Sequence, residues 1–585
     1  MISGSSMSPG IAFGKPLILR ESNISISKVK ISDDQIEKEV LKFFSARHKT
    51  IKQLKIIKDM TKNSIGESKS EIFEGHIMLV EDDEFEKSVI EIIEKEKKTA
   101  ESAIKKAINK QIKSIEKIDN TYLRERALDF KDIGTRMLKN VLGIPIINLG
   151  SIDNRSILVA KDISPSEISQ LNLKKILGLI IEFGGKASHS FIIAKSLEIP
   201  SIFGVKDAIN KIQKCSYIIL DALNNKIYCN PSEMEIKKAK KIQHKHLKIK
   251  KSLENLKNFP AITIDGHRIK LCANVNGIHD IQITKSQSAD GIGLYRTEFL
   301  YMNRNSFPCE EEQFETYKKI AVSINPNPIT IRTIDIGGDK TTSCIEFPKE
   351  ENPFLGWRAI RVSMDRKEIL HTQIRAILRA SNFGKIYIMF PMIISIEEIL
   401  YLKEEILFIK KQLKKKKYEF DPSIKIGVMI ETPAAAVISR DLAKEVDFFS
   451  IGTNDLTQYT LAVDRNNEKI SHLYNPISPS VLRLIKKVIS NSHKEGKWTG
   501  ICGEIAGDET YSALLLGMGV DELSMSSSSI QKVKRIIRNV SYRDAKKLAE
   551  KSIKKSKIKE IEKTTISFLL KRNLIKKTSH SKNSL

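Results

Sequence analysis

The sequence is poor in cysteine, in aromatic residues and in long apolar runs. Its 585 residues include only six cysteines, which lie far apart and form no CxxC pair. This pattern predicts reduced thiols in a cytoplasmic protein and excludes a disulfide framework. No apolar stretch reaches the roughly 18 residues that span a bilayer, so we expect no membrane insertion. The first residues, MISGSSMSPGIAFGK, lack a basic segment and a continuous apolar segment, so we expect no signal peptide.

Acidic residues are outnumbered by basic ones. The chain has 98 Lys and Arg against 71 Asp and Glu, a formal net charge of +27. Such an excess is compatible with a polyanionic partner. The lysines are nevertheless scattered over predicted helix faces, and aromatic residues, 6% of the chain, do not alternate with the basic runs as they would in a single-strand binder. The chain is also rich in Ile and Asn, whose codons, like those of Lys, are AT-rich. We therefore expect no nucleic-acid partner and keep a basic nucleic-acid binder as an alternative.

The pattern of apolar residues divides the chain into segments. Short apolar runs separated by turns predict an α/β domain over 1–32 and 144–230. Apolar residues at helical spacing predict an inserted all-α subdomain, two helical hairpins, over 33–143. A lysine-rich helical stretch over 231–260 with a narrow apolar stripe is typical of a connector, and we expect it to act as a hinge. The polar tail, 576–585, carries no structural signal.

Eight short apolar runs recur over 261–575, with helical segments between most of them. The runs are RIKLCANV, GIGLYRTE, ITIRTIDIG, KIYIMFPMI, IKIGVMIETP, DFFSIGTND, WTGICGE and DELSMS. About eight strand–helix repeats in roughly 300 residues match the (β/α)8 TIM barrel. The fold class predicted for the whole chain is therefore α/β, with a C-terminal TIM barrel and an N-terminal α/β domain that carries a helical insert.

Polar residues stand at the ends of nearly all the candidate barrel strands, where barrel enzymes carry their chemistry. They are Asn274, Arg296, Arg332, Asp335, Glu431, Asn454, Asp455, Cys502 and Ser524, and we expect Arg358 and Arg465 in loops over the same rim. Converging arginines indicate a small polyanionic substrate, because guanidinium groups pair bidentately with phosphate and carboxylate. Carboxylates among them would repel an anion unless a cation intervenes, so Glu431 and Asp455 are candidate Mg²⁺ ligands. The alternative makes each arginine a surface salt bridge and each carboxylate a helix cap.

Two further residues could take part in chemistry. At a strand end facing arginines, Cys502 could give or take a proton, although a structural buried thiol is equally compatible with its position. The segment GGKASHSFIIAKSLEIPSIFG places His189 in the first turn of a predicted helix, where backbone N–H groups would favour a phosphoryl group on the imidazole. A capping histidine on an exposed helix start remains the alternative there.

The motifs together resemble one family over residues 1 to about 575. GGKASHS, GIGLYRTEFLY, IRTIDIGGDK, NPFLGWRAIR, IMFPMI, VMIETPAA, SIGTNDLTQYTLAVDR, YNPISPSVL and GICGEIAGD occur in the order and near the spacing of Enzyme I of the bacterial sugar phosphotransferase system. The resemblance implies transfer of a phosphoryl group from phosphoenolpyruvate (PEP), with Mg²⁺ as cofactor, to the chain itself and then to the phosphocarrier protein HPr. It also implies a phosphohistidine swivelling domain at the N-terminus, HPr docking on the helical insert, a homodimer through the barrel and a cytoplasmic location.

The resemblance also implies a role for each candidate. His189 would carry the phosphoryl group and Cys502 would protonate the departing enolate. The PEP-binding residues would be Arg296, Arg332, Arg358, Asn454, Asp455 and Arg465, and the metal ligands would be Glu431 and Asp455. The family commonly has Arg-Thr where Lys186 and Ala187 stand here, which puts the hydrogen bonding of phospho-His189 in doubt.

Two further alternatives are compatible with the motifs, and only the second belongs to another functional class. One is an ATP-dependent pyruvate/PEP dikinase-type enzyme, but the 33–143 insert has no Gly-rich phosphate loop and is too short for a nucleotide-binding domain. The other is a non-catalytic regulatory protein of the same fold. The joint presence of His189, Glu431, Asp455 and Cys502 argues against it.

Overall fold

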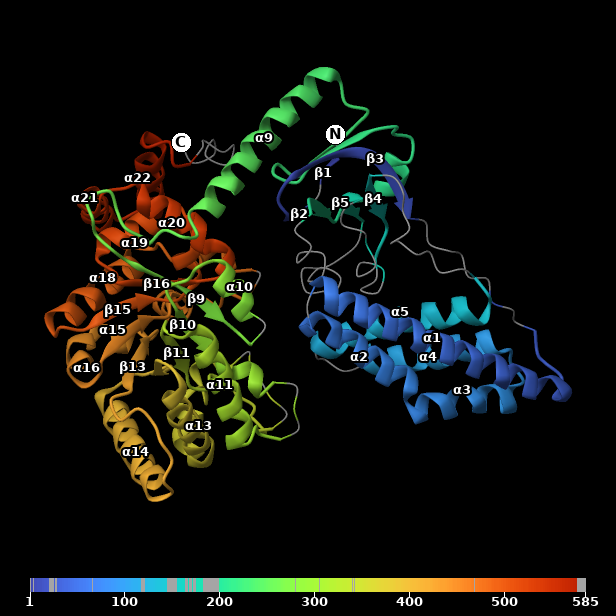
Figure 1. Cartoon of the computed structure of the whole chain (residues 1–585), viewed down its shortest axis with the longest axis horizontal. Helices are drawn as coiled ribbons and strands as arrows, with labels where there is room; N and C mark the ends of the chain where they lie inside the picture. The colour runs from blue at the N-terminus through green and yellow to red at the C-terminus, as the bar shows by residue number, and fades with distance from the viewer. Residues whose placement is uncertain are drawn as a thin grey trace. The chain divides into compact units, whose positions relative to one another are not determined.

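The computed structural model consists of two compact units, Met1–Ile249 and Lys250–Leu585 (Figure 1). It describes all residues except 1, 4, 20–25, 27–28, 66, 117–120, 145–154, 164–166, 168–170, 172–174, 183–198, 279, 303, 305, 339, 341, 343, 468 and 576–585. The predicted active-site histidine segment, with Lys186, Ala187 and His189, and the predicted tail therefore lie outside the described residues. The division between the units falls within helix α9 (Glu233–Asn255), in the segment predicted as a connector.

The first unit contains an eight-stranded mixed sheet. Its strands are β1 (Ile2–Ser3), β2 (Ser5–Ser8), β3 (Ile11–Leu19), β4 (Ser156–Ala160), β5 (Ile176–Ile181), β6 (Ser201–Phe203), β7 (Ile218–Asp221) and β8 (Lys226–Cys229). They lie in the order β1-β8-β7-β3-β4-β5-β6-β2, with parallel pairing only from β3 through β6. The strand β4 is buried along its whole length, as expected of a central parallel strand. The short helix α8 (Ala208–Ile212) contributes Ala208 and Ile212 to the same core.

Five helices form the insert in this unit. They are α1 (Ile36–Ile65), α2 (Glu67–Glu81), α3 (Asp83–Glu96), α4 (Ala100–Glu116) and α5 (Thr121–Val141). Their apolar stripes meet in one core, which includes Phe43 and Leu54 of α1 and Ile104 of α4. Sequence periodicity predicted two hairpins; α3 is the additional helix, begun by Asp82 as its N-cap.

The second unit is a closed parallel barrel of eight strands. They are β9 (Lys270–Val275), β10 (Ile292–Arg296), β11 (Ile329–Arg332), β12 (Ile386–Phe390), β13 (Lys425–Ile430), β14 (Phe448–Ile451), β15 (Trp498–Ile501) and β16 (Glu522–Met525). Each of the eight predicted apolar runs contains one of them. With the mixed α/β unit that precedes it, the barrel confirms the predicted fold class.

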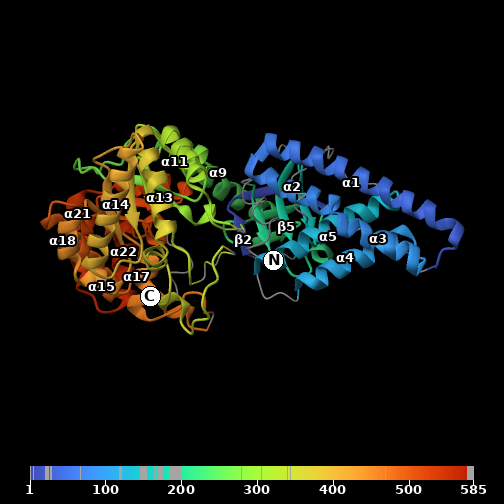
Figure 2. The ribbon, with the colours of Figure 1, turned by 90° about the horizontal axis from the view of Figure 1, so that it is seen from below.

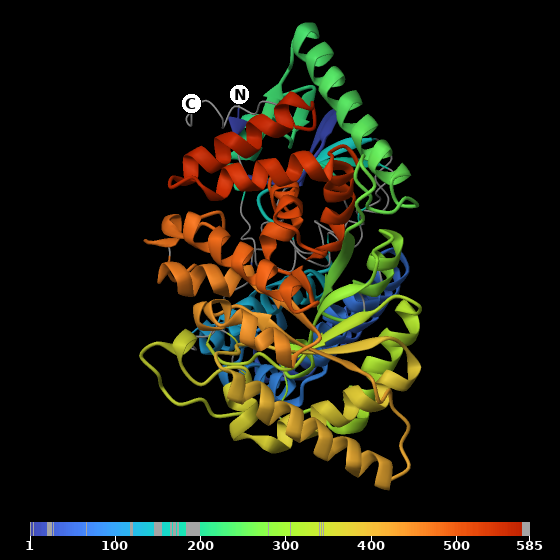
Figure 3. The same ribbon diagram turned by 90° about the vertical axis from the view of Figure 1, so that its left-hand side faces the viewer.

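Helices surround these strands on the outside, as Figure 2 and Figure 3 show. They are α10 (Asp280–Ser286), α11 (Glu310–Ile324), α12 (Ile360–Asp365), α13 (Lys367–Ala380), α14 (Ile396–Lys415), α15 (Pro433–Val437), α16 (Ser439–Glu445), α17 (Thr453–Leu461), α18 (Pro479–Lys494), α19 (Ser512–Met518), α20 (Ile530–Arg538), α21 (Tyr542–Ile553) and α22 (Ile558–Lys571). Among the helices of the described residues, none has the length and apolar character needed to cross a bilayer.

Side chains alternate between the two faces of the barrel strands. On β12, Ile388 and Phe390 pack outward in the large core beneath the helices, whereas Tyr387 and Met389 point into the barrel. Near the amino ends of the strands, Phe448 and Trp498 stack at 4.5 Å between ring centroids and fill the interior. The barrel interior is thus a packed core, and in barrels of this kind ligands bind at the carboxyl ends of the strands.

Candidate active site

A pocket of about 370 Å³ lies at the carboxyl ends of the barrel strands. Its wall consists of Leu294, Arg296, Glu298, Phe299, Met302, Arg332, Lys340, Met429, Glu431, Gly452, Asn454, Asp455, Arg465, Cys502, Gly503 and Glu504. Arg296 and Arg332 are the last residues of β10 and β11, and Cys502 directly follows β15. Parallel strands carry these side chains to the same end of the barrel, which explains why residues as distant in sequence as Arg296 and Cys502 meet.

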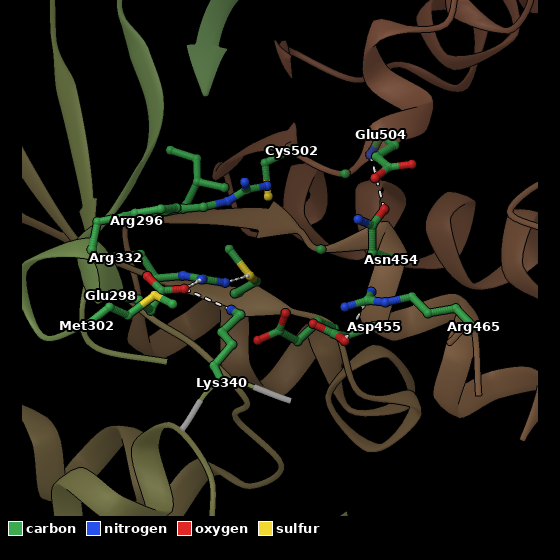
Figure 4. Close-up of a pocket in the computed structure, with 16 residues that line it drawn as sticks. Arg296, Glu298, Met302, Arg332, Lys340, Asn454, Asp455, Arg465, Cys502 and Glu504 are labelled. Carbon is green, nitrogen blue, oxygen red and sulfur yellow. Dashed lines mark hydrogen bonds and ion pairs between the residues drawn. The ribbon is translucent and has the colours of Figure 1, made fainter. Parts of the chain in front are cut away.

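Seven of the nine predicted site residues line this one pocket. They are Arg296, Arg332, Glu431, Asn454, Asp455, Arg465 and Cys502. Figure 4 shows Arg296, Arg332 and Lys340 on one side of the space, with Asn454, Asp455 and Arg465 on the other. The structure thus brings cationic groups, carboxylates and a thiol around one small space. Their chemical roles stay predictions.

Arg358 does not lie where the sequence suggested. We expected it in a loop over the rim, but its side chain is 0% exposed and is not part of the pocket wall. Its Nε donates to Asp335 Oδ1 at 2.9 Å, and its Nη2 donates to Asp455 Oδ2 at 3.1 Å. Burial requires such pairing, because an unpartnered buried guanidinium would be costly. Arg358 therefore holds Asp455 from behind the pocket wall, and the predicted placement over the rim is wrong.

One wall of the pocket is a buried ionic network that sequence reasoning missed in part. Arg332 pairs with Glu298 and with Asp335, the latter at 3.2 Å, and Lys340 Nζ lies 2.8 Å from both carboxylates. Burial acts to raise the pKa of Glu298, but the charges of Arg332 and Lys340 outweigh it and lower that pKa. Both carboxylates are thus ionised and fix the cations. Glu298 and Lys340 lie in the motifs GIGLYRTEFLY and IRTIDIGGDK, in the segments that follow β10 and β11, and these motifs were the available signal.

The facing wall brings two carboxylates together. Burial, and then the charge of Asp455, raises the pKa of Glu431 to about 8. Glu431 Oε1 accepts a hydrogen bond from the Met392 backbone N–H at 2.7 Å. Asp455 Oδ1 is buried without a hydrogen bond, and Arg465 Nη1 approaches it only to 3.5 Å. A Cβ atom at Gly452 would lie 2.7 Å from Glu431 Oε2, so glycine leaves the carboxylate its room.

This pair of carboxylates suits a hard divalent cation. An orphaned carboxylate oxygen and a second carboxylate with a raised pKa mark a place where positive charge is missing. Mg²⁺ is typically held by one or two carboxylates and takes its other ligands from substrate and water. Among the described residues, no cluster of three or more His, Cys, Asp and Glu could hold a metal without such help. The donor set thus fits Mg²⁺ and not a site made by protein ligands alone.

Cys502 is buried in the pocket wall and holds its proton. Burial raises the pKa of its thiol to about 11, although Ser450 and the charge of Arg332 act in the opposite direction. The sulfur lies 3.7 Å from the backbone oxygen of Ile451. At neutral pH the group is therefore a thiol, suited to donate a proton rather than to attack as a thiolate.

The side chains of Asn454 and Arg296 each have a hydrogen bond to a neighbour, and the Asn454 backbone oxygen also accepts from the Tyr474 hydroxyl at 3.2 Å. Asn454 Oδ1 accepts from the Glu504 backbone N–H at 3.1 Å, which leaves its amide N–H groups available to a ligand. Arg296 Nη1 donates to Asn276 Oδ1 at 3.3 Å. Glu504 was not predicted as a site residue, although it belongs to the same motif, GICGEIAGD, as Cys502.

Comparisons with known proteins identify the family of the chain. The chain matches models described as PEP-utilising enzyme, N-terminal, over 3–126; PEP-utilising enzyme, mobile domain, over 152–225; and PEP-utilising enzyme, PEP-binding domain, over 250–542. It is 56% identical to the phosphoenolpyruvate-protein phosphotransferase of Buchnera aphidicola subsp. Schizaphis graminum, covering 96% of this chain and 98% of that protein. The protein of the same name from Haemophilus influenzae is 52% identical (98% and 100% covered). That from Listeria innocua is 44% identical (96% and 98% covered).

Proposed function

The chain belongs to the phosphoenolpyruvate-protein phosphotransferases, and from this premise we propose that it phosphorylates its own His189 and then passes the phosphoryl group to HPr. It is a transferase that uses PEP as phosphoryl donor. The observation that carries the proposal is the pocket in which arginines, two carboxylates and a protonated thiol surround one space large enough for a small anion.

In the proposed reaction the P–O bond of PEP breaks as an N–P bond forms on the His189 imidazole. Arg296, Arg332 and Arg465 would bind the phosphate and carboxylate of PEP, with Asn454 as a further contact. The enolate left behind takes the proton of the Cys502 thiol at carbon and leaves as pyruvate, and the thiolate is reprotonated from solvent. Positioning and charge neutralisation by these side chains would supply most of the rate.

Glu431 and Asp455 would hold Mg²⁺ in this site. The bound ion would neutralise anionic oxygens of the substrate. Arg358 would keep Asp455 oriented for this task, since its guanidinium binds Asp455 Oδ2 from behind. A homodimer through the barrel unit and a cytoplasmic location complete the proposal, and both rest on the family resemblance.

Mass spectrometry on the chain incubated with PEP and Mg²⁺ tests the proposal. We expect one phosphoryl group, stable in base and labile in acid, on the peptide that contains His189. Removal of Mg²⁺ with a chelator before PEP is added should leave the peptide unmodified. A phosphoryl group on another residue, or labelling with ATP in place of PEP, would contradict the assignment.

HPr would dock on the helical insert, at the acidic run Glu81–Glu84. All four side chains are exposed, and Met78 beside them is 64% exposed. Phe85, which directly follows the acidic run, is buried at 3% exposure in the helical core and adds no apolar surface there. Asp82 accepts a hydrogen bond from the Phe85 N–H and caps α3, so its carboxylate also has a structural task. The docking proposal therefore depends on Glu81, Asp83, Glu84 and Met78, as a surface for a basic partner.

Replacing Glu81, Asp83 and Glu84 together with lysine should slow phosphoryl transfer to HPr and spare phosphorylation of His189. Loss of favourable charge pairs at a docking surface lowers the association rate, here by about tenfold or more at low salt. The measurement is the rate of HPr phosphorylation at several salt concentrations. Replacement of the exposed Glu404, Asp441 and Glu550 with lysine changes the net charge equally and is the control. A parental HPr rate in the first triple variant would refute docking at this run.

A further inference from the structure

Cys502 is held from two sides of the barrel. Its backbone N–H donates to the oxygen of Ile451, the last residue of β14, at 3.1 Å, and its thiol faces the same oxygen. On the other side, Asn274 Nδ2 in β9 donates to the Cys502 backbone oxygen at 2.9 Å. A backbone with both polar groups bonded has little freedom to rotate, so the direction of its thiol is set by these neighbours.

A serine determines which way the Asn274 amide faces. Ser524 Oγ in β16 donates to Asn274 Oδ1 at 2.6 Å, and Ser524 is 1% exposed. A flipped amide would still allow a hydrogen bond with the hydroxyl, which can donate or accept, but its oxygen would then face the Cys502 oxygen. Both bonds together therefore favour the one orientation in which the amide N–H reaches Cys502.

The neighbouring strand leaves space for this arrangement. A Cβ atom on Gly293 in β10 would lie 2.6 Å from Ser524 Oγ and 2.5 Å from Glu522 Oε1. Glycine at 293 is thus required by the polar side chains that β16 directs into the barrel. The hydroxyl of Ser524 lies in an interior position, where a polar group needs a partner, and Asn274 is that partner.

We propose that Ser524 and Asn274 are positioning residues that aim the Cys502 thiol into the pocket. This Ser524–Asn274 brace contacts neither the pocket space nor, in the proposed reaction, the substrate; it acts through the Cys502 backbone. The inference rests on the proposed role of Cys502 as the acid that protonates the enolate. The inference itself concerns only the orientation of the thiol: without the brace, the thiol can still donate a proton but no longer points into the pocket.

Asn274→Asp tests the brace with an isosteric change. An ionised carboxylate accepts from Ser524 but presents its second oxygen to the Cys502 oxygen, so the bond becomes a repulsion; a protonated carboxyl can donate and restores the bond. We expect single-turnover pyruvate formation to slow by about tenfold at pH 8 with the half-saturating PEP concentration nearly unchanged. Relative to the parent at each pH, the defect should shrink as pH falls. A merely structural role would not produce this recovery.

The rate at which iodoacetamide alkylates Cys502 in the full chain measures the position of the thiol without any substrate. The alkylated peptide that contains Cys502 is quantified by mass spectrometry. We expect alkylation about threefold or more slower in Asn274→Asp at pH 8, because a thiol that no longer points into the pocket is less accessible to the reagent. A smaller decrease is expected in Ser524→Ala, where the amide is kept but no longer oriented. Asn539→Asp is the matched control, since it also removes an amide-to-carbonyl bond, to Arg535 O, on the barrel surface.

The outcomes separate the brace from the proposed function. Parental alkylation and parental pyruvate formation in both variants would overturn the brace. Slower alkylation with unchanged pyruvate formation would overturn Cys502 as the acid and support the brace. If Asn274→Asp fails to fold, Ser524→Ala carries the same two readouts, and its parental behaviour in both would be equally decisive against the brace.

Discussion

Replacing His189 with alanine is expected to abolish phosphoryl labelling of the chain from PEP. Alanine offers no nitrogen on which an N–P bond can form, and no other side chain is proposed as acceptor, so the loss should be complete rather than partial. The measurement is the amount of base-stable, acid-labile label retained by the protein after incubation with radiolabelled PEP and Mg²⁺. Transfer to HPr should disappear with it.

A second histidine variant makes this result specific. His244 is exposed on α9, and His244→Ala should be labelled to the parental extent. Melting temperatures of both variants would show whether either has lost its fold. Label that persists in a folded His189→Ala protein would contradict the assignment of the phosphoryl acceptor, whatever happens to HPr.

Replacing Cys502 with alanine is expected to slow pyruvate release by about 100-fold or more. A positioned general acid contributes about 10²–10⁴-fold to a reaction, and alanine removes the only proton proposed for the enolate. The measurement is pyruvate formed in a single turnover. Because burial holds the pKa of the parental thiol near 11, the group stays protonated from pH 6 to 9. Its acid function should therefore cause no loss of rate in that window and should decline only as pH approaches 11.

Cys309→Ala supplies the control, because Cys309 is an exposed cysteine of the same unit and is not part of the pocket wall. The control should release pyruvate at the parental rate. An unchanged rate in Cys502→Ala would remove the proton-donor role. In that case the buried thiol would serve only to pack against Met429 and Leu294 in the barrel interior.

Local patterns in the chain were sufficient for the architecture. Runs such as KIYIMF and IKIGVMI predicted strands β12 and β13, because an apolar run bounded by turns and followed by a helical segment has few other solutions. The same logic predicted which side chains share a pocket. In a parallel barrel every carboxyl end lies at one rim, so Arg296, Glu431 and Cys502 could be grouped before any coordinates.

Burial within that rim could not be predicted in the same way. Phe85 directly follows four exposed acidic residues, and Arg358 was expected in a loop over the rim. Phe85 nevertheless enters the helical core, and Arg358 is buried between Asp335 and Asp455. A local pattern says which way a strand or helix faces, but not what the rest of the chain packs over it.

What the sequence alone determined is thus the fold class, the eight strands of the barrel, the family and the set of polar groups at one end of the barrel. Only the tertiary structure decided which of those groups line the space, which of them hold others, and what proton each carries. The raised pKa values of Glu431 and Cys502 and the reach of Asn274 to the Cys502 backbone depend on neighbours more than 20 positions away. Dielectric environment and hydrogen-bond partners are properties of the packed interior, and no run of adjacent residues encodes them.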